Sequence, residues 1–170
     1  MLPLEKKSVS EDCFLLLQVQ KPEIPSHVYK EAQSRNFIEK DEFHISLVVA
    51  KNARKVKEVI SQSSEPEKLW EEIKTFFESL VWEYTLIDEY HLQENSYNEP
   101  KHTRRTIIQK VNLPNLLPFY EKLNQILGIT LPVPVPHITL LSWSDNPLFM
   151  TKGIGISSEE DFKMYSRGAL

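Results

Sequence analysis

A four-residue motif occurs twice in this chain of 170 residues, as His44-Ile45-Ser46-Leu47 and as His137-Ile138-Thr139-Leu140. Both copies read H-I-[S/T]-L, and both lie in apolar, β-branched surroundings that are typical of strands. Side chains at positions i and i+2 of a strand point to the same face. Each motif therefore places an imidazole beside a hydroxyl on one face, with its apolar residues directed to the core.

The chain before each motif follows the same order of elements. A proline precedes each motif at a nearly equal distance: 22 residues separate Pro22 from His44, and 23 separate Pro114 from His137. In both places the sequence predicts a strand, a proline break, a helix and then the strand that carries the motif. We therefore expect a weak internal duplication of a β-α-β unit. Its copies cover residues 13–50 and 104–143, and residues 51–100 form an insert between them.

Local patterns predict the remaining elements. Ser64 and Glu67 form an S-x-x-E capping box ahead of an apolar helical stripe from Leu69 to Leu80. Residues 94–102 are polar and rich in turn formers, so we expect a loop there. Strands are expected over 13–20, 43–50, 82–93 and 104–112. Helices are expected over 26–36, around 56–60 and over 119–127. Ser26 is expected to cap the first of these helices, and Gly128 to end the last. The prolines of 131–136 predict an extended chain, and 153–162 predicts a short strand or turn before a terminal helix.

Size and composition describe an ordinary globular chain. The 170 residues fit one domain, and 41% hydrophobic residues are sufficient for a sizeable core. The single cysteine, Cys13, cannot form an internal disulfide and is expected to be a buried thiol, which points to a cytoplasmic protein. We expect no targeting segment and no membrane span. No exposed apolar stripe predicts obligate assembly, so the expected state is a monomer without an obligate protein partner.

Charge limits the kind of partner. A formal net charge of −4 argues against a broad DNA-binding surface but leaves room for a small patch that holds one phosphate. Two basic clusters are present, both interpreted first as solvated faces. They are Lys51, Arg54, Lys55 and Lys57, and then Lys101, Arg104 and Arg105.

The paired motifs favour acid–base chemistry on an anion. A lone histidine on a strand is more often structural, but two copies at repeat-equivalent positions indicate function. If the two units face one another, two imidazoles and two hydroxyls surround one spot. An unperturbed histidine has a pKa near 6.5, so one ring can accept a proton while the other donates one. The hydroxyls are short donors suited to a tetrahedral anion such as phosphate, which predicts phosphodiester hydrolysis without a metal.

Competing chemistries fit the sequence less well. Zinc sites need three or four histidine, cysteine or carboxylate ligands, and neither motif supplies a third. His91 beside Asp88 and Glu89 is interpreted as an edge residue rather than a ligand, and His27 as a structural helix residue. The chain has no G-x-S-x-G nucleophile elbow and only four glycines, so neither a serine hydrolase nor a phosphate-binding glycine loop is predicted.

Two H-x-[S/T] motifs, each on the second strand of a duplicated β-α-β unit, resemble the signature of the 2H phosphoesterases. Within that superfamily the chain is similar to the 2′,5′-RNA ligase-like group, also described as RNA 2′,3′-cyclic phosphodiesterases. The resemblance covers most of the chain outside the insert. It implies an α+β fold with two lobes related by a pseudo-twofold axis, two antiparallel sheets around a central groove, and catalysis without a metal or cofactor.

The resemblance also implies roles for individual residues. His44 and His137 correspond to the acid–base pair, and the sequence does not decide which is the acid. Ser46 and Thr139 correspond to the hydroxyls that hold the phosphate. Arg105 is a candidate groove residue or a solvated one, and Trp143 is a candidate for stacking a base at the groove rim or for packing. Three features depart from the family pattern: Ser46 replaces the commoner threonine, the insert 51–100 is unfamiliar, and 131–136 is rich in proline.

Two functions of different classes follow. The first is a phosphodiesterase that hydrolyses a cyclic phosphate or phosphodiester on an RNA end or small nucleotide, either of which would be its partner. The second is a non-catalytic module that binds a nucleotide or RNA end on the same fold. Two intact histidines favour the enzyme, since binding alone does not need two proton-transfer groups.

Overall fold

The computed structural model describes residues 2–3, 6–9 and 12–170. Its described strands are β1 (Leu2–Pro3), β2 (Lys6–Val9), β3 (Leu15–Val19), β4 (Ile38–Glu39), β5 (Phe43–Val48), β6 (Glu83–Asn98), β7 (Lys101–Asn112), β8 (His137–Ser144) and β9 (Ser166–Ala169). Its described helices are α1 (Ser26–Ser34), α2 (Ala50–Gln62), α3 (Pro66–Ser79), α4 (Leu116–Leu127) and α5 (Glu159–Tyr165), with a 3₁₀ turn η1 at Pro147–Phe149. The protein is therefore of the mixed α+β class.

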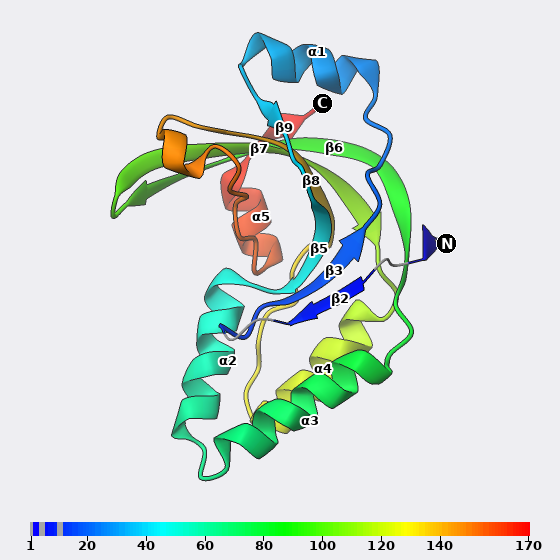
Figure 1. Ribbon diagram of the computed structural model, residues 1–170, viewed down its shortest axis with the longest axis vertical. Helices are drawn as coiled ribbons and strands as arrows, with labels where there is room; N and C mark the ends of the chain where they lie inside the picture. The colour runs from blue at the N-terminus through cyan, green and yellow to red at the C-terminus, as the bar shows by residue number, and fades with distance from the viewer. Residues whose placement is uncertain (1, 4–5, 10–11) are drawn as a thin grey trace.

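The strands form one antiparallel sheet rather than two separate ones, in the order β1-β6-β7-β8-β5-β3-β2, with β4 beside β8 and β9 beside β6. Its two halves meet between β5 and β8, where Ile45 and Ile138 are the one register pair among the described residues. The expectation of two sheets is thus corrected to one sheet with a narrow junction. Figure 1 shows the long β6–β7 ribbon curving across one end of the molecule.

The main core lies on the face of the sheet that carries Ile45 and Ile138, both 0% exposed. Helices α2, α3 and α4 lie together at one end of the molecule and α1 lies at the other (Figure 1). Phe77 of α3 and Phe119 of α4 are fully buried and contact Trp82, which precedes β6. The predicted apolar stripe of α3 is confirmed, since it packs against this core.

The opposite face of the sheet carries the two histidines, and we call it the histidine face. A smaller apolar cluster covers part of it, built from Ile108 of β7, Ile154 and Ile156 of the segment after η1, and Phe162 and Tyr165 of α5. In Figure 1 α5 lies within the curve of the β6–β7 ribbon. The segment 150–165 is therefore a cover on the histidine face, joined to it by a few apolar side chains.

Residues 94–102 do not form the expected loop. They continue β6 and β7 as a hairpin, in which Asn95 pairs with Arg104 and Tyr97 with His102. These residues suggested a loop because they are polar, but contacts between side chains on the two paired strands stabilise the hairpin. Tyr97 and His102 stack with ring centroids 4.8 Å apart.

Helix ends differ from the sequence predictions at the caps. The Ser64–Glu67 capping box does not form: α3 begins at Pro66, and the Ser63 hydroxyl instead accepts a bond from the Glu65 amide at 3.1 Å. Ser26 is the first residue of α1 rather than its cap. Helix α4 begins at Leu116, three residues before the expected start, because a proline is tolerated in a first turn whose amides need no helical partner.

Other local predictions are confirmed. Gly128 ends α4 in the left-handed conformation with φ 66°, and residues 131–136 contain no helix or strand. Cys13 is 5% exposed, and burial raises the pKa of its thiol. Among the described residues, no helix combines the length and apolar character needed to cross a membrane.

Candidate functional site

The two H-I-[S/T]-L motifs meet at the junction of the half-sheets. Continuing the antiparallel register one residue from the Ile45–Ile138 pair places His44 opposite Thr139 and Ser46 opposite His137. Side chains directly opposite each other on neighbouring strands have Cβ atoms about 4.5–5.5 Å apart. Each imidazole therefore lies across from the hydroxyl of the other motif, all on the histidine face.

These four side chains line one small cavity of about 110 Å³. Its remaining walls come from Val49, at the start of α2, and from Gly153–Ile156 in the segment after η1. A water molecule's share of liquid volume is about 30 Å³, so the space suits a compact group such as phosphate rather than a nucleoside. Two imidazoles and two hydroxyls thus surround a cavity of the size of one anion.

His137 is held in one tautomer. Its ring is 5% exposed, and Nδ1 lies 2.7 Å from the carbonyl oxygen of Val135, which can only accept. Nδ1 is therefore the protonated nitrogen in the neutral ring, and Nε2 keeps a free lone pair. Burial lowers the pKa of His137, the Val135 carbonyl opposes that change, and the nearby His44 lowers the pKa further. The ring is neutral at pH 7 and able to accept a proton.

His44 lies in a more open and more charged environment. Burial is the main cause that lowers its pKa, and Lys40 adds to this effect, whereas Glu42 favours the charged ring. Among the described residues, neither ring nitrogen of His44 has a hydrogen-bond partner. His44 is therefore free to donate to or accept from a ligand, and a bound anion would favour its protonated form.

The wall of the cavity is fixed by bonds to the start of α2. The Ser157 hydroxyl donates to the carbonyl of Val49 at 3.0 Å, and Asn52 donates to the carbonyl of Ser157 at 3.1 Å. Lys51 pairs with Asp161 at 2.5 Å, which ties α5 to α2. Gly155 has no room for a side chain, because an added Cβ would lie 2.5 Å from that of Ala50. The segment is therefore closely packed where it closes over the histidines.

Arg105 and Trp143 do not reach the cavity. Thr139 pairs with Ile108 but Leu141 pairs with Ile107, so β8 carries one extra residue between them. This bulge reverses the alternation, and Trp143 falls on the opposite face from Thr139. Arg105 lies over the Trp143 ring at 4.7 Å. A sequence pattern without bulges would place Trp143 and Thr139 on the same face. Neither Arg105 nor Trp143 lines the small cavity, and a role for either at the groove rim stays a prediction.

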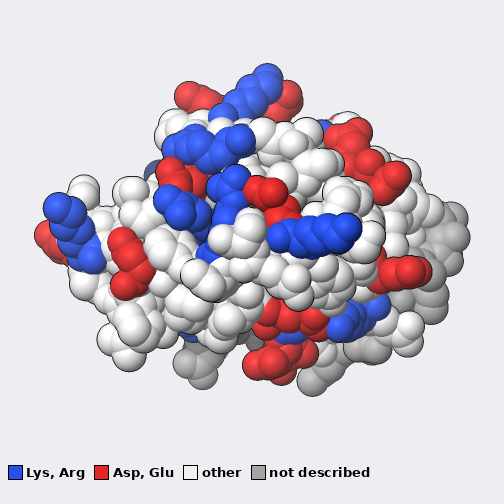
Figure 2. Space-filling model, turned by 90° about the horizontal axis from the view of Figure 1, so that it is seen from above, with Lys and Arg blue, Asp and Glu red and all other residues white. Residues whose placement is uncertain are grey.

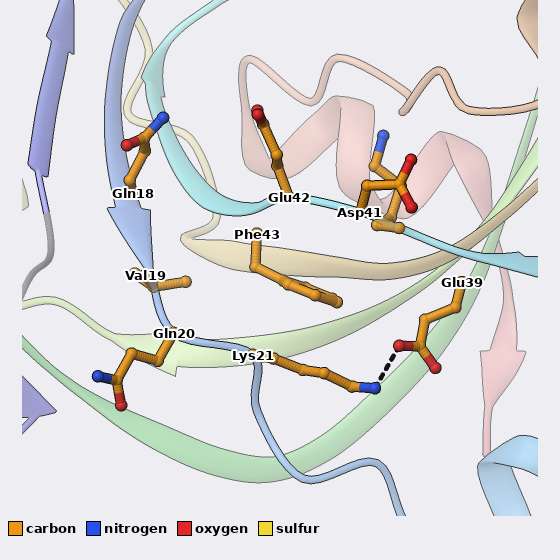
Figure 3. Close-up of a pocket in the computed structure, with 9 residues that line it drawn as sticks. Gln18, Val19, Gln20, Lys21, Glu39, Asp41, Glu42 and Phe43 are labelled. Carbon is orange, nitrogen blue, oxygen red and sulfur yellow. Dashed lines mark ion pairs between the residues drawn. The ribbon is translucent and has the colours of Figure 1, made fainter.

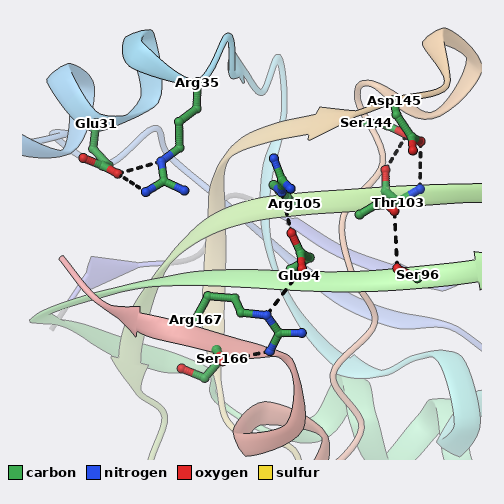
Figure 4. Close-up of polar contacts among 10 residues, drawn as sticks. All are labelled: Glu31, Arg35, Glu94, Ser96, Thr103, Arg105, Ser144, Asp145, Ser166 and Arg167. Carbon is green, nitrogen blue, oxygen red and sulfur yellow. Dashed lines mark hydrogen bonds and ion pairs between the residues drawn. The ribbon is translucent and has the colours of Figure 1, made fainter.

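Ion pairs complete the surroundings of Arg105. Its Nε donates to Glu94 at 2.5 Å, and Glu94 also pairs with Arg167 (Figure 4). The two cations lower the pKa of the Glu94 carboxyl. The Arg105 guanidinium is therefore already paired, on the face of the sheet opposite the histidine face.

Arg104 occupies the position that was expected for Arg105. It lies on the histidine face, and its Nη1 donates to the carbonyl of Gly153 in the cavity wall at 3.2 Å. Its Nε donates to Nε2 of His102 at 2.9 Å, and its guanidinium lies over the rings of Tyr97 and Phe149. The sequence contained the signal, an arginine pair on a strand. The alternation of β7 decides which arginine faces the site, because Arg104 lies on the same face as Ile108, the partner of Thr139.

Two larger cavities adjoin the first. One of about 410 Å³ shares His44 and Gly153 with it and is also lined by Lys40, Asp41, Glu42, Thr151 and Lys152. The next, of about 700 Å³, shares residues 40–42 with the second and extends past Phe43 to Gln18 and Lys21. Figure 3 shows Lys21 paired with Glu39 at this third cavity, with the Phe43 ring beside the Lys21 side chain. The shared lining residues make the three cavities one groove that starts at the two histidines.

The face of the molecule seen in Figure 2 carries mixed charge. In the view of Figure 2, Lys and Arg side chains alternate with Asp and Glu, and the two signs are not separated into large areas.

The other expectations about site chemistry concern metals and histidines. No group of three or more His, Cys, Asp or Glu side chains in the described part of the chain is arranged to hold a metal ion. His27 is exposed on α1, with its ring edge against Tyr90. His91 packs edge-on against Phe162, and its Nε2 lies 3.6 Å from a carboxylate oxygen of Glu89.

Comparisons of the chain with protein-family models, with curated proteins and with solved structures found no match.

Proposed function

We propose that this chain is a metal-independent phosphodiesterase of the 2H phosphoesterase type, which opens a cyclic phosphate on an RNA end or small nucleotide. The observation that carries the proposal is the small cavity shared by His44, Ser46, His137 and Thr139. Two motifs that lie 93 residues apart in the sequence contribute the same pair of functional groups to one space.

The order and pairing of the elements support an internal duplication, as the proposal requires. The two units are β3–α1–β5 and β7–α4–β8, and in each the two strands are antiparallel neighbours. The residue opposite the histidine is Gln18 in the first unit and Lys110 in the second, each directly before a buried valine. This correspondence supports a pseudo-twofold relation of the two units about the Ile45–Ile138 pair.

In the proposed reaction His137 is the base. Its Nε2 takes a proton from water as the water oxygen attacks phosphorus. The bond from phosphorus to one ribose oxygen breaks, and His44 donates a proton to that leaving oxygen. His44 is the acid because Glu42 and the bound phosphate both favour its charged form. Ser46 and Thr139 donate to the phosphate oxygens, where negative charge increases in the transition state.

The test uses a 2′,3′-cyclic nucleotide and an oligonucleotide with a cyclic end, both in EDTA. The wild type should hydrolyse at least one of them, and His44→Ala or His137→Ala should each reduce kcat/KM by about 10²–10⁴. His27→Ala is the matched control, because it removes an exposed imidazole from α1. Turnover that disappears in EDTA, or that survives both substitutions, would contradict the proposed mechanism.

The alternative is a non-catalytic module that binds a nucleotide or RNA end. One observation favours it: segment 150–165 covers part of the histidine face, and His137 is 5% exposed. Binding of a cyclic nucleotide without turnover, across several phosphodiesters, would select this alternative.

A further inference from the structure

We infer that the cavity of about 410 Å³ binds a second phosphate of the substrate through Lys40 and Lys152. The preferred substrate then carries two phosphates on one nucleotide: the 3′ phosphate that reacts, and a further phosphate on the 5′ side. This inference rests on the proposed function and names the substrate class of the same site. The first cavity, of about 110 Å³, has room for the reacting phosphate alone. The nucleoside attached to that phosphate must therefore lie in the adjoining space of about 410 Å³.

Two cations of that adjoining cavity have no carboxylate partner. Lys40 and Lys152 both line it, and neither is within 4.0 Å of a carboxylate oxygen among the described residues. By contrast, Lys21 in the third cavity is already paired with Glu39. Burial is the main cause that lowers the pKa of Lys40; repulsion from Lys152 lowers it further, and Asp41 and Glu42 act in the opposite direction. An anion placed between them would relieve that repulsion.

Lys40 is held in place before any ligand binds. Its ammonium donates to the carbonyl of Thr151, in the same segment that continues into the wall of the first cavity. A phosphate bound there needs little further ordering of this side chain, which reduces the entropic cost of binding. Lys152 is exposed and lies next to Thr151 in the sequence, so it approaches the same phosphate from the solvent side.

The acidic residues of the cavity select a nucleotide over a simple anion. Asp41 and Glu42 are exposed and line the same space as the two lysines. They would repel a free phosphate, but they accept hydrogen bonds from sugar hydroxyls and from the amino groups of bases. A nucleotide presents both kinds of group, a phosphate for the lysines and donors for the carboxylates.

Binding affinity tests this inference independently of turnover. The probes are adenosine 3′-monophosphate, adenosine 3′,5′-bisphosphate and an adenosine dinucleotide with a 3′-terminal phosphate, titrated by calorimetry at low salt. The bisphosphate should bind about tenfold more tightly than the monophosphate, as one charge-assisted contact of ordinary strength requires. A similar gain for the dinucleotide indicates that any 5′ phosphate is accepted, and a gain for the dinucleotide alone indicates an RNA strand.

Lysine variants provide the decisive comparison. Lys152→Ala should reduce the tenfold advantage to about threefold and Lys152→Glu should abolish it, while monophosphate affinity changes little. Lys68→Ala, which removes an exposed lysine from α3, is the control for net charge. Equal affinity for the three probes, an advantage that survives Lys152→Glu, or no binding of any probe would overturn the inference. Absence of cyclic nucleotide turnover would instead defeat the proposed function and leave this affinity ratio intact.

Discussion

Two glycines in the cavity wall differ in the space around them, and alanine at each should have a different effect. The added Cβ of Gly155→Ala would lie 2.5 Å from Cβ of Ala50. That of Gly153→Ala would lie 3.6 Å from the Thr139 hydroxyl, an ordinary contact. Neither glycine has a φ in the left-handed region, so backbone strain does not enter the comparison.

The expected magnitude at Gly155 follows from that contact. Carbon atoms pack best at about 3.5–4.0 Å, so Ala50 and the new methyl group must separate by roughly 1 Å. Ala50 cannot easily yield, since its φ is 47° and the preceding carbonyl of Val49 is held by Ser157. Overpacking of this kind costs about 1–3 kcal/mol. Gly155→Ala should therefore lower the free energy of unfolding by about 2 kcal/mol.

Gly153→Ala should leave the fold intact and affect the cavity instead. Glycine-to-alanine changes at unstrained positions raise the free energy of unfolding by about 0.4–1 kcal/mol. The new methyl group has roughly the 30 Å³ volume of a water molecule, about a quarter of the 110 Å³ cavity. We therefore expect unchanged or slightly greater stability together with weaker binding of inorganic phosphate.

Urea unfolding and phosphate titration of both variants provide the measurement. If Gly155→Ala unfolds at the same urea concentration as the wild type, then segment 153–156 is not packed against α2 as described. If Gly153→Ala binds phosphate as well as the wild type, the small cavity is not the anion site.

Three further outcomes are expected. Because burial lowers the pKa of both His44 and His137, kcat/KM should follow a bell-shaped profile with its optimum below pH 6.5, and a flat profile would count against paired imidazoles. The free energy of unfolding should fall as pH drops below 6.5, because His137 binds a proton in the unfolded chain, at its ordinary pKa, but not in its buried place. His137→Gln should make this fall smaller. If urea unfolding shows the same pH dependence of the free energy of unfolding in variant and wild type, the explanation is wrong. Tyr120→Phe should lower the free energy of unfolding by about 1–3 kcal/mol. The buried Tyr120 hydroxyl donates to the Leu47 carbonyl at 2.6 Å, and phenylalanine leaves that carbonyl without this donor. An unchanged urea midpoint would contradict that role.

The strands that carry the site could be predicted from the sequence because their signals are local. Apolar residues at positions 45, 47, 138 and 140 are all buried, as alternation requires. The meeting of the two motifs was inferred from the repeat, and the cavity that contains all four polar side chains agrees with it. The elements of the two units differ in length, with 9 residues in α1 and 12 in α4, so the nearly equal spacing of proline and histidine was the informative signal.

Other parts depended on interactions that are not local. The bulge at Leu140 moves Trp143 to the face opposite Thr139, and no pattern in the sequence of β8 predicts it. The 94–102 hairpin is stabilised by cross-strand stacking of Tyr97 and His102, which propensity alone does not reveal. Residues 153–156 show no sequence pattern that predicts their place in the cavity wall. Their position depends on the bonds of the adjoining Ser157 with Asn52 and Val49, which form only in the folded chain.

The bond between His137 and the Val135 carbonyl has a chemical consequence. Val135 precedes a proline, so its backbone is confined to extended conformations and its carbonyl is preset for the ring. A neutral amide, unlike a carboxylate, contributes no full negative charge when the imidazole gains a proton. In the reaction proposed above, the compensating charge would then come from whatever occupies the cavity, so this ring would act efficiently as a base only beside a bound anion.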